Sequence, residues 1–361
     1  MIKPSKRLKN IFRIKDNFRV YQNKIRLNRN EDPSGWDNKV LNKFLKTIKY
    51  EDFSFYKDSL ELEKKISKKY SVKCNQVLIT SGADGAIKKV FETFIDYKDK
   101  VLILDPSWPM YEVYSNIFNA KIIKKNFKED LSLNIENICT EILNKNIRLF
   151  ILANPNMPTG TIVDNNDILK IIKVCAKRNT LVLIDEAYHL FYKSSQLKQV
   201  NKFKNLIFVR TFSKAFGLAS LRIGYIITNE NFVRNMNKLR SVTNSNGFAI
   251  KAAEFIFNNY GYFEKRVEKY IKGREYIYEK LNLNNIISSK SYANFLLIKC
   301  KDNKNANMLI KKIEKKGYLI KGPYKDKILK NYVRVTTGPL KLMKLFWRDC
   351  YKEITYCAKK K

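Results

Sequence analysis

A lysine set among hydroxyl side chains is the residue of this sequence best suited to covalent chemistry. Lys214 stands within Thr-Phe-Ser-Lys-Ala-Phe-Gly-Leu-Ala-Ser-Leu-Arg, a string that runs from Thr211 to Arg222 and follows a short apolar run. A lysine amine forms an imine with an aldehyde, and Thr211, Ser213 and Arg222 offer neutral and cationic donors to phosphate oxygens. A single lysine after a strand is usually a surface residue, but the whole string favours an aldehyde cofactor that carries a phosphate.

A carboxylate closes another apolar run. Asp185 follows the run 181–184 and begins Asp-Glu-Ala-Tyr, so that Tyr188 comes three residues later. A carboxylate at the carboxyl end of a buried strand can bond a protonated pyridine nitrogen and keep it charged, and the tyrosine could hydrogen-bond a ring hydroxyl. The alternative is that Asp185 caps a following helix. His189, the only histidine, is better explained by packing than by base catalysis.

Two turns that follow predicted strands add candidate ligand contacts. At residues 81–84, Ser-Gly-Ala-Asp, a strand turns into a helix, and the free N–H groups of a helix start bind phosphate. The turn at 154–160, Asn-Pro-Asn-Met-Pro-Thr-Gly, contains two prolines and a glycine, which restrict its backbone. Ligands of open α/β sheets bind beside the carboxyl ends of the strands, so both turns are expected at the site.

The residues between these motifs predict the scaffold that must position them. Short apolar runs with little polar alternation are interleaved with segments of helical patterning such as 59–70 and 165–178. Buried strands interleaved with helices argue for a mostly parallel sheet that helices cover on both faces. The predicted large domain is therefore α/β, with strands at 76–80, 101–104, 148–153, 181–184, 206–209 and 223–227.

The pattern changes after about residue 230, where long charged helices replace the interleaved strands. Helices are predicted at 231–241, 248–282 and 303–316, and strands at 294–299, 318–321 and 332–336. This grouping indicates a smaller α+β domain. We expect an N-terminal arm over residues 1–35, a large cofactor-binding domain over 36–245 and a small domain over 246–361, with which the N-terminal segment packs.

Composition narrows the class of protein further. Of the 361 residues, 45% are hydrophobic and 29% charged, the balance of a compact globular protein. The formal net charge of +37 attracts anions in general, but no motif that reads DNA or RNA accompanies it, so no nucleic-acid partner is expected. The six cysteines show no CxxC spacing, which indicates neither a metal site nor a disulfide framework. No signal peptide or membrane span is evident, so a cytoplasmic protein is expected.

Four strings, in their order and at their separations, resemble the class I and II aminotransferases, and most closely the histidinol-phosphate aminotransferase branch. The resemblance covers the chain from about Ile25 to Leu345. It implies pyridoxal 5'-phosphate as cofactor, the aspartate aminotransferase fold (fold type I), and a homodimer with active sites at the subunit interface. The strings are Pro158-Thr-Gly160, Asp185-Glu-Ala-Tyr188, the lysine string from Thr211 to Arg222, and Tyr332-Val-Arg334-Val-Thr-Thr-Gly338.

The same resemblance implies a role for each residue of the site. Lys214 would be the Schiff-base lysine and proton shuttle, Asp185 the partner of the pyridine nitrogen, and Tyr188 the partner of the ring oxygen. Arg334 would clamp a carboxylate of the substrate, with Lys321 and Asn30 also in contact with substrate. The other implied cofactor contacts are Gly82, Ala83, Asp84, Thr211, Ser213 and Arg222 at the phosphate, Trp108 stacked on the ring, and Tyr56 reaching the phosphate of the neighbouring subunit.

Two positions depart from the family pattern. Met157 stands where the family usually has an asparagine that bonds the ring oxygen, so that bond would depend more on Tyr188, with Asn156 as a possible substitute. Lys321 stands where the histidinol-phosphate branch usually has an arginine, and a lysine binds phosphate as a point charge and not as a fork.

The sequence thus predicts an aminotransferase that moves an amino group between an amino acid, expected to be glutamate, and a small phosphorylated keto or aldehyde compound. The alternative is a decarboxylase of a phosphorylated hydroxyamino acid on the same fold. Relatives of this branch use the same residues for both reactions and differ mainly in how the substrate is turned relative to the ring.

Overall fold

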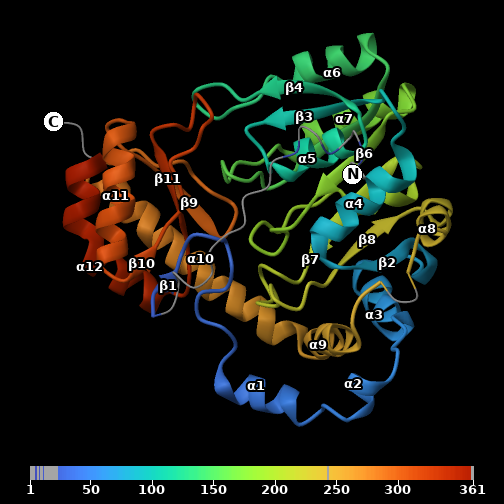
Figure 1. Cartoon of the computed structure of the whole chain (residues 1–361), viewed down its shortest axis with the longest axis horizontal. Coiled ribbons are helices and arrows are strands. Elements are labelled where there is room, and N and C mark those ends of the chain that lie inside the picture. Colours follow the sequence, from blue (N-terminus) through green and yellow to red (C-terminus); the bar gives the residue numbers. More distant parts are fainter. Residues whose placement is uncertain (1–4, 6–7, 9–10, 12–22, 242–243, 359–361) are drawn as a thin grey trace, which may run out of the picture.

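The computed structural model describes residues 5, 8, 11, 23–241 and 244–358, and these form a larger and a smaller part that lie side by side (Figure 1). The larger part is built on a seven-stranded sheet with the strand order β2-β8-β7-β6-β5-β3-β4. Only β8 runs against its neighbours, so the predicted mostly parallel α/β fold is confirmed. The strands are β2 (Val77–Thr80), β3 (Lys100–Asp105), β4 (Lys121–Asn126), β5 (Ile147–Ala153), β6 (Leu181–Asp185), β7 (Leu206–Thr211) and β8 (Gly224–Thr228).

Helices cover both faces of this sheet, which explains why its central strands carry so few polar residues. On β5, for example, Phe150 and Leu152 belong to the buried cluster on one face, and Leu149 and Ile151 to the cluster on the other. Each such buried aliphatic or aromatic side chain contributes about 1.5–3 kcal/mol. The helices on the first face are α3 (Leu60–Tyr70), α6 (Ile135–Asn144), α7 (Asn165–Lys177) and α9 (Gly247–Asn258), and those on the second are α4 (Gly82–Phe94), α5 (Met110–Ile117) and α8 (Glu230–Asn237).

The smaller part combines short sheets with three long helices. An antiparallel pair is formed by β9 (Phe295–Lys299) and β11 (Tyr332–Thr336). The helices α10 (Tyr260–Leu283), α11 (Asn303–Lys315) and α12 (Leu340–Ala358) bury their apolar faces around a core of their own. The N-terminal strand β1 (Ile25–Arg26) pairs in parallel with β10 (Tyr318–Leu319), so residues from the start of the chain join the smaller part before the chain enters the larger one.

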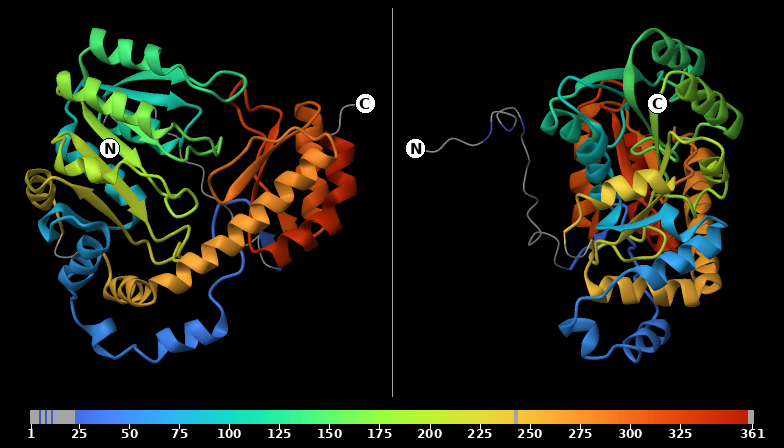
Figure 2. Two further views of the ribbon diagram at one scale, coloured as in Figure 1. Left: turned by 180° about the vertical axis from the view of Figure 1, so that it is seen from behind. Right: turned by 90° about the vertical axis from the view of Figure 1, so that its right-hand side faces the viewer.

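The helix α10 joins the two parts and crosses from one to the other (Figure 2). Its residues up to Tyr270, together with those of α9, share the core of the sheet, whereas Ile277 and Leu281 belong to the core of the smaller part. By packing, the change from one core to the other therefore falls inside α10, and the boundary expected after residue 245 lies earlier, ahead of α9. Two short helices, α1 (Asn38–Leu45) and α2 (Glu51–Ser54), connect β1 to α3 along the outside of the larger part.

Some predicted elements differ from the structure. The helix expected over 248–282 is two helices, because Asn259 has non-helical backbone angles between α9 and α10. The strand expected at 318–321 ends at Leu319, and Lys321 forms only an isolated bridge with Arg334. The sequence did not predict β4, α5, α6 or α12. Of these, α5 begins at Met110, directly after Trp108 and Pro109, and bears on the site.

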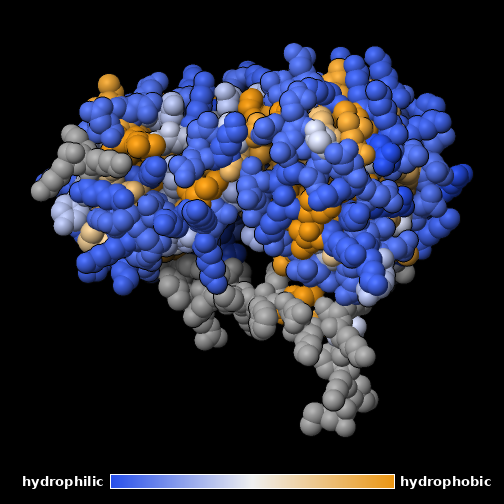
Figure 3. All heavy atoms as spheres, turned by 90° about the horizontal axis from the view of Figure 1, so that it is seen from above, coloured by the Kyte–Doolittle hydropathy of each residue, from blue (hydrophilic) through white to orange (hydrophobic). Residues whose placement is uncertain are grey.

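The surface is mostly hydrophilic on the face shown in Figure 3, with apolar side chains scattered among charged ones. In the part of the chain that the structure describes, no helix combines the length and the apolar character needed to cross a membrane.

Candidate active site

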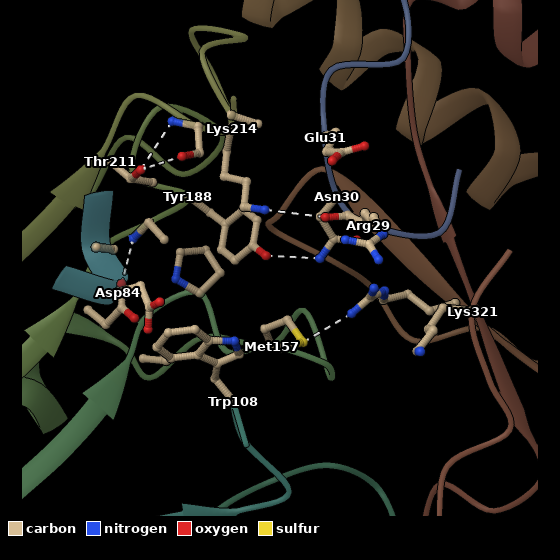
Figure 4. Close-up of a pocket in the computed structure, with 18 of the residues that line it drawn as sticks. Arg29, Asn30, Glu31, Asp84, Trp108, Met157, Tyr188, Thr211, Lys214 and Lys321 are labelled. Carbon is tan, nitrogen blue, oxygen red and sulfur yellow. Dashed lines mark hydrogen bonds between the residues drawn. The ribbon is translucent and has the colours of Figure 1, made fainter. Parts of the chain in front are cut away.

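The carboxyl ends of the parallel strands meet the N-terminal segment and the smaller part around a pocket of about 740 Å³. Three sets of residues line it, and Figure 4 shows them converging on one space. The first follows strands of the large sheet, the second is residues 26–31 beside β1, and the third comes from β11 and the loop after β10. Its volume is that of a typical cofactor or substrate site.

Lys214 lies three residues after the end of β7, in a turn that its neighbours hold. The backbone N–H of Ser213 donates to Oγ1 of Thr211 over 3.1 Å, and the two hydroxyls bond to each other. The Lys214 amine points into the pocket and donates to the carbonyl of Arg29 over 3.3 Å. Burial, followed by the charge of Arg334, lowers the pKa of Lys214 to about 8. Near neutral pH a fraction of this amine is therefore uncharged and nucleophilic.

Asp185 is the last residue of β6, and its side chain is buried at the pocket wall. It accepts hydrogen bonds from the hydroxyl of Tyr111 at 2.7 Å and from the backbone N–H of Ala187 at 3.0 Å. Burial raises the pKa of Asp185 to about 6, and the bond from Tyr111 opposes that rise. The residue is thus a desolvated carboxylate above that pH, which a cationic group of a ligand would stabilise. The alternative role as a helix cap fails because no helix starts at Asp185.

Tyr111 is a residue of the site that the sequence analysis missed. It lies in α5, three residues after Trp108, and is fully buried against Asp185 and Trp108, whose ring is nearly perpendicular to its own. Its hydroxyl is one of two hydrogen-bond donors to the Asp185 carboxylate among the described residues. The only sequence signal was the spacing of two aromatic residues at the start of a helix that the pattern did not predict.

We expect Tyr111→Phe to destabilise the cofactor-free protein more at pH 8 than at pH 5. At pH 8 Asp185 is charged and loses a donor, which costs about 1–3 kcal/mol, whereas at pH 5, below its pKa of about 6, most of the carboxyl is neutral. Urea unfolding at the two pH values measures the difference. Tyr318→Phe is the matched control, because Tyr318 donates to Asp349 over 2.8 Å outside the pocket lining and the pKa of Asp349 is lowered by its hydrogen bonds. Equal losses at both pH values for Tyr111→Phe would contradict this role.

A cradle for an anion lies beside Lys214, at the first turn of α4. Ala83 and Asp84 line the pocket there together with Thr211, Ser213 and Arg222. The first N–H groups of a helix have no partner within it and favour anions. Gly82 is not part of the lining but makes room for it: its φ is +75°, and a Cβ on it would lie 3.0 Å from Nη2 of Arg222. The Arg222 guanidinium also lies 3.4 Å from the Ser213 hydroxyl.

Trp108 and Tyr188 form opposite walls of the same space (Figure 4). Trp108 offers a flat apolar face on which a heteroaromatic ring can stack. Tyr188 is buried, and burial raises its pKa to about 12, so that it is a neutral phenol. Its oxygen accepts a hydrogen bond of 2.9 Å from Nδ2 of Asn30.

The end of the pocket away from the cradle is cationic. Arg334 on β11 donates to the carbonyl of Asn28 over 2.8 Å and contacts the thioether sulfur of Met157 at 3.0 Å. Its buried Nε has no hydrogen-bond partner among the described residues. Lys321 lies on the same side (Figure 4), and Arg26 pairs with Glu31 at 2.7 Å at the rim. A buried guanidinium with a weak sulfur acceptor and an unpaired N–H is suited to an anionic ligand group.

Two further predicted contacts do not line the pocket. Asn156 is not in the lining, because its amide donates to the carbonyl of Pro106 and to the hydroxyl of Thr159, and its oxygen accepts from Ser107. Asn156 therefore stabilises the turn. The prediction that it would replace the asparagine that the family usually has at position 157 is wrong. Tyr56 is 86% exposed and does not line the pocket of its own chain.

The predicted contact Asn30 does line the pocket, and its side chain bonds to Tyr188 and Thr336. Four neighbours of Asn30 were missed as pocket residues: Arg26, Asn28, Arg29 and Glu31.

His189 and the buried ion pair Glu186–Arg210, at 2.6 Å, lie on the other side of β6 and β7. His189 and Arg210 line a separate and smaller cavity, of about 260 Å³, with Tyr70 and Tyr260. Burial holds the pKa of His189 well below its usual value. The histidine is therefore a neutral packing residue, as the sequence analysis favoured.

The geometry is that of enzymes that bind a phosphorylated aldehyde, and comparisons with known proteins identify the family. The model for "Aminotransferase class I and II" matches residues 22–345, so the chain belongs to the class I and II aminotransferases. Within that family it belongs to the histidinol-phosphate aminotransferase branch. The histidinol-phosphate aminotransferase of Clostridium novyi is 32% identical over 318 residues, 87% of each chain. That of Methanocaldococcus jannaschii is 32% identical over 331 residues, covering 89% of this chain and 87% of its own.

Solved structures agree on the fold. The histidinol-phosphate aminotransferase of Sinorhizobium meliloti in complex with pyridoxal-5'-phosphate superposes with a TM-score of 0.88, at 20% identity, over 99% of this chain and 98% of that one. The L-threonine-O-3-phosphate decarboxylase of Porphyromonas gingivalis superposes with a TM-score of 0.76, at 23% identity, over 91% and 98%. The chain therefore has the aspartate aminotransferase fold (fold type I).

The protein is a pyridoxal-phosphate-dependent aminotransferase, and its pocket fits that cofactor. A buried carboxylate faces the same space as a lysine amine of lowered pKa. In the cradle at α4, the Arg222 guanidinium lies against Gly82, where a Cβ would come within 3.0 Å of it. A cationic ring nitrogen, an aldehyde and a phosphate are the three groups that these residues would satisfy.

Proposed function

We propose that the enzyme transfers the amino group of an amino acid, expected to be glutamate, to a small phosphorylated keto or aldehyde compound. The observation that supports this is the pair of cationic side chains, Arg334 and Lys321, at the end of the pocket opposite the phosphate cradle. A substrate held there can carry two anionic groups besides those of the cofactor. Relatives named histidinol-phosphate aminotransferases are 32% identical to this chain, which makes histidinol phosphate the first amine to test.

In this proposal the cofactor supplies an aldehyde that carries the amino group and a ring that accepts electrons. Ala83, Asp84, Thr211, Ser213 and Arg222 hold its phosphate, and Asp185 holds a proton at its ring nitrogen. Tyr188 donates to its ring oxygen and Trp108 stacks on its face. Lys214 would bind the aldehyde of the cofactor, and its amine would take the proton from the substrate carbon and return it.

Arg334 is proposed to bind the carboxylate of the amino acid. Its Nη1 contacts only the sulfur of Met157, and its Nε has no acceptor among the described residues, so a carboxylate would supply the missing oxygen partners. Lys321 is proposed to attract the phosphate of the acceptor as a point charge.

The substrate assignment is tested by a matrix of two variants and three substrates. We expect Arg334→Ala to weaken glutamate, a neutral amino acid and any other substrate with a carboxylate, because a charge-assisted contact contributes about 1.5–3 kcal/mol, or roughly 10- to 100-fold in affinity. We expect Lys321→Ala to weaken only the phosphorylated amine, by about tenfold, and less so in high salt. Apparent affinities at low and high ionic strength check both. Equal losses for all substrates at Lys321 would assign it to the fold or the cofactor instead.

The second candidate reaction is decarboxylation, because the solved decarboxylase of Porphyromonas gingivalis has the same fold. The two reactions differ in the substrate bond that lies perpendicular to the cofactor ring. Incubation with a phosphorylated hydroxyamino acid, and separately with an amine and α-ketoglutarate, distinguishes release of carbon dioxide from formation of glutamate.

We also propose that the enzyme works as a homodimer in the cytoplasm. A cluster of exposed apolar side chains lies around α2, at Tyr50, Phe53, Phe55, Tyr56 and Leu60, and large exposed apolar patches mark interfaces. Tyr56 lies in this cluster, so a second subunit placed on it would contact Tyr56. Sedimentation of the purified protein tests the dimer.

A further inference from the structure

Hydrogen bonds fix both the backbone and the side chain of Asn30, and its amide nitrogen makes one of them. It is buried, with 2% of its surface exposed. Its backbone N–H donates to the Thr336 hydroxyl over 2.9 Å, that hydroxyl donates to Oδ1 over 3.2 Å, and its carbonyl accepts from Asn294 over 3.1 Å. The remaining polar atom, Nδ2, donates to the Tyr188 oxygen over 2.9 Å (Figure 4).

The backbone of Asn30 suits this residue. Its φ is 54°, in the left-handed region that asparagine tolerates better than most residues with a Cβ. The groups that hold it, Thr336 at the end of β11 and Asn294 just before β9, belong to the smaller part. The smaller part therefore places the Nδ2–H group of Asn30 against Tyr188, which follows β6 of the large sheet.

This contact determines what the Tyr188 hydroxyl can do. Its oxygen accepts from Asn30, so its own hydrogen is left to donate to another acceptor. A phenol whose oxygen accepts a hydrogen bond also donates more strongly. Met157, which lines the same pocket, has a thioether and cannot donate at all.

We propose that Asn30 is a positioning residue, and not a substrate contact, which orients the Tyr188 hydroxyl so that it donates to the ring oxygen of the cofactor. The inference rests on the proposed contact between Tyr188 and that oxygen. A donor to the ring oxygen withdraws electron density from it, and this lowers the pKa of the nitrogen that joins Lys214 to the cofactor. Asn30 thereby sets the pH at which that nitrogen loses its proton.

The test is a pH titration of the near-visible absorbance of the cofactor-loaded protein, without substrate. Asn30→Gly removes the side chain and tolerates the positive φ. We expect it to raise the titration midpoint by roughly 0.5–1 pH unit, the size of one hydrogen bond. Tyr188→Phe should raise the midpoint at least as far, and Asn30→Gly should add nothing in the Tyr188→Phe protein. Asn179→Gly, at an exposed position outside the pocket lining where φ is also positive (51°), is the matched control and should leave the midpoint unchanged.

The outcomes separate this inference from the proposed function. If Tyr188→Phe leaves the midpoint unchanged, Tyr188 does not contact the ring oxygen and both ideas are wrong. If Tyr188→Phe shifts the midpoint, three results would overturn only the role of Asn30. Asn30→Gly could leave the midpoint unchanged, it could lower the midpoint, or it could shift the midpoint equally in the Tyr188→Phe protein. Should Asn30→Gly fail to fold, Asn30→Asp keeps the size and the oxygen that Thr336 contacts but replaces the donor with an acceptor. Asn30→Asp should then shift the midpoint by a larger amount in the otherwise wild-type protein than in the Tyr188→Phe protein.

Discussion

Lys214→Ala is expected to fold and to have no measurable turnover, with a loss of at least about 10⁴-fold. The substitution removes both the amine that would hold the cofactor and the group that would move the substrate proton, and a positioned acid–base group alone contributes about 10²–10⁴-fold. Little apolar packing is lost, because the amine faces the pocket and is not part of the buried core.

The loss is measured by turnover with saturating cofactor and by the near-visible absorbance of the purified protein. Lys202→Ala, at an exposed position outside the pocket lining, is the control and should behave as wild type. Turnover of Lys214→Ala near the wild-type rate would remove Lys214 from the mechanism. Cofactor capture by the free protein should also speed up as pH rises through about 8, the pKa to which burial lowers this amine.

Asp185→Asn is expected to slow turnover by about 10²–10³-fold while making the cofactor-free protein more stable. The rate falls because an amide cannot stabilise a charged ring nitrogen as a carboxylate does. The stability rises because burial lifts the pKa of Asp185 from 3.8 to about 6. A carboxyl with a raised pKa destabilises the fold above that pKa and not below its unfolded value, so removing the charge should stabilise by up to about 3 kcal/mol at pH 8 and by little at pH 4.

Urea unfolding of the cofactor-free variant at the two pH values, beside steady-state rates, measures both effects. The opposite directions make the result specific, because a residue that only supported the fold would lose stability and activity together. An unchanged rate would return Asp185 to a purely structural role, and a loss of stability at pH 8 would mean that Tyr111 and Ala187 compensate the buried charge fully.

The central site residues were predictable because each follows a strand closely in the sequence. Asp185 ends β6, Lys214 follows β7 and Ala83 follows β2. Parallel strands place their carboxyl ends at one edge of the sheet. Residues that lie within a few positions of those ends are therefore brought to the same edge of the sheet.

Other features could not be predicted because they depend on pairing between distant segments. Residues 26–31 enter the pocket because β1 pairs with β10, and no local pattern indicates that partner. Asn156 was wrong for a local reason: it turns away from the pocket to brace the loop, whereas its neighbour Met157 lines the pocket. Which of two adjacent residues in a proline-rich turn faces a ligand depends on its backbone conformation.

The sequence by itself determined the fold class, the cofactor and the residues that follow the sheet strands, because hydrophobic periodicity and short motifs are local properties of the chain. The tertiary structure alone decided the hydrogen-bond partners and the pKa values of those residues. Tyr111 donates to Asp185, and Asn30 donates to Tyr188 across 158 positions of sequence. Burial, which only the folded chain creates, raises the pKa of Asp185 and lowers that of Lys214, since desolvation disfavours whichever form of a group is charged.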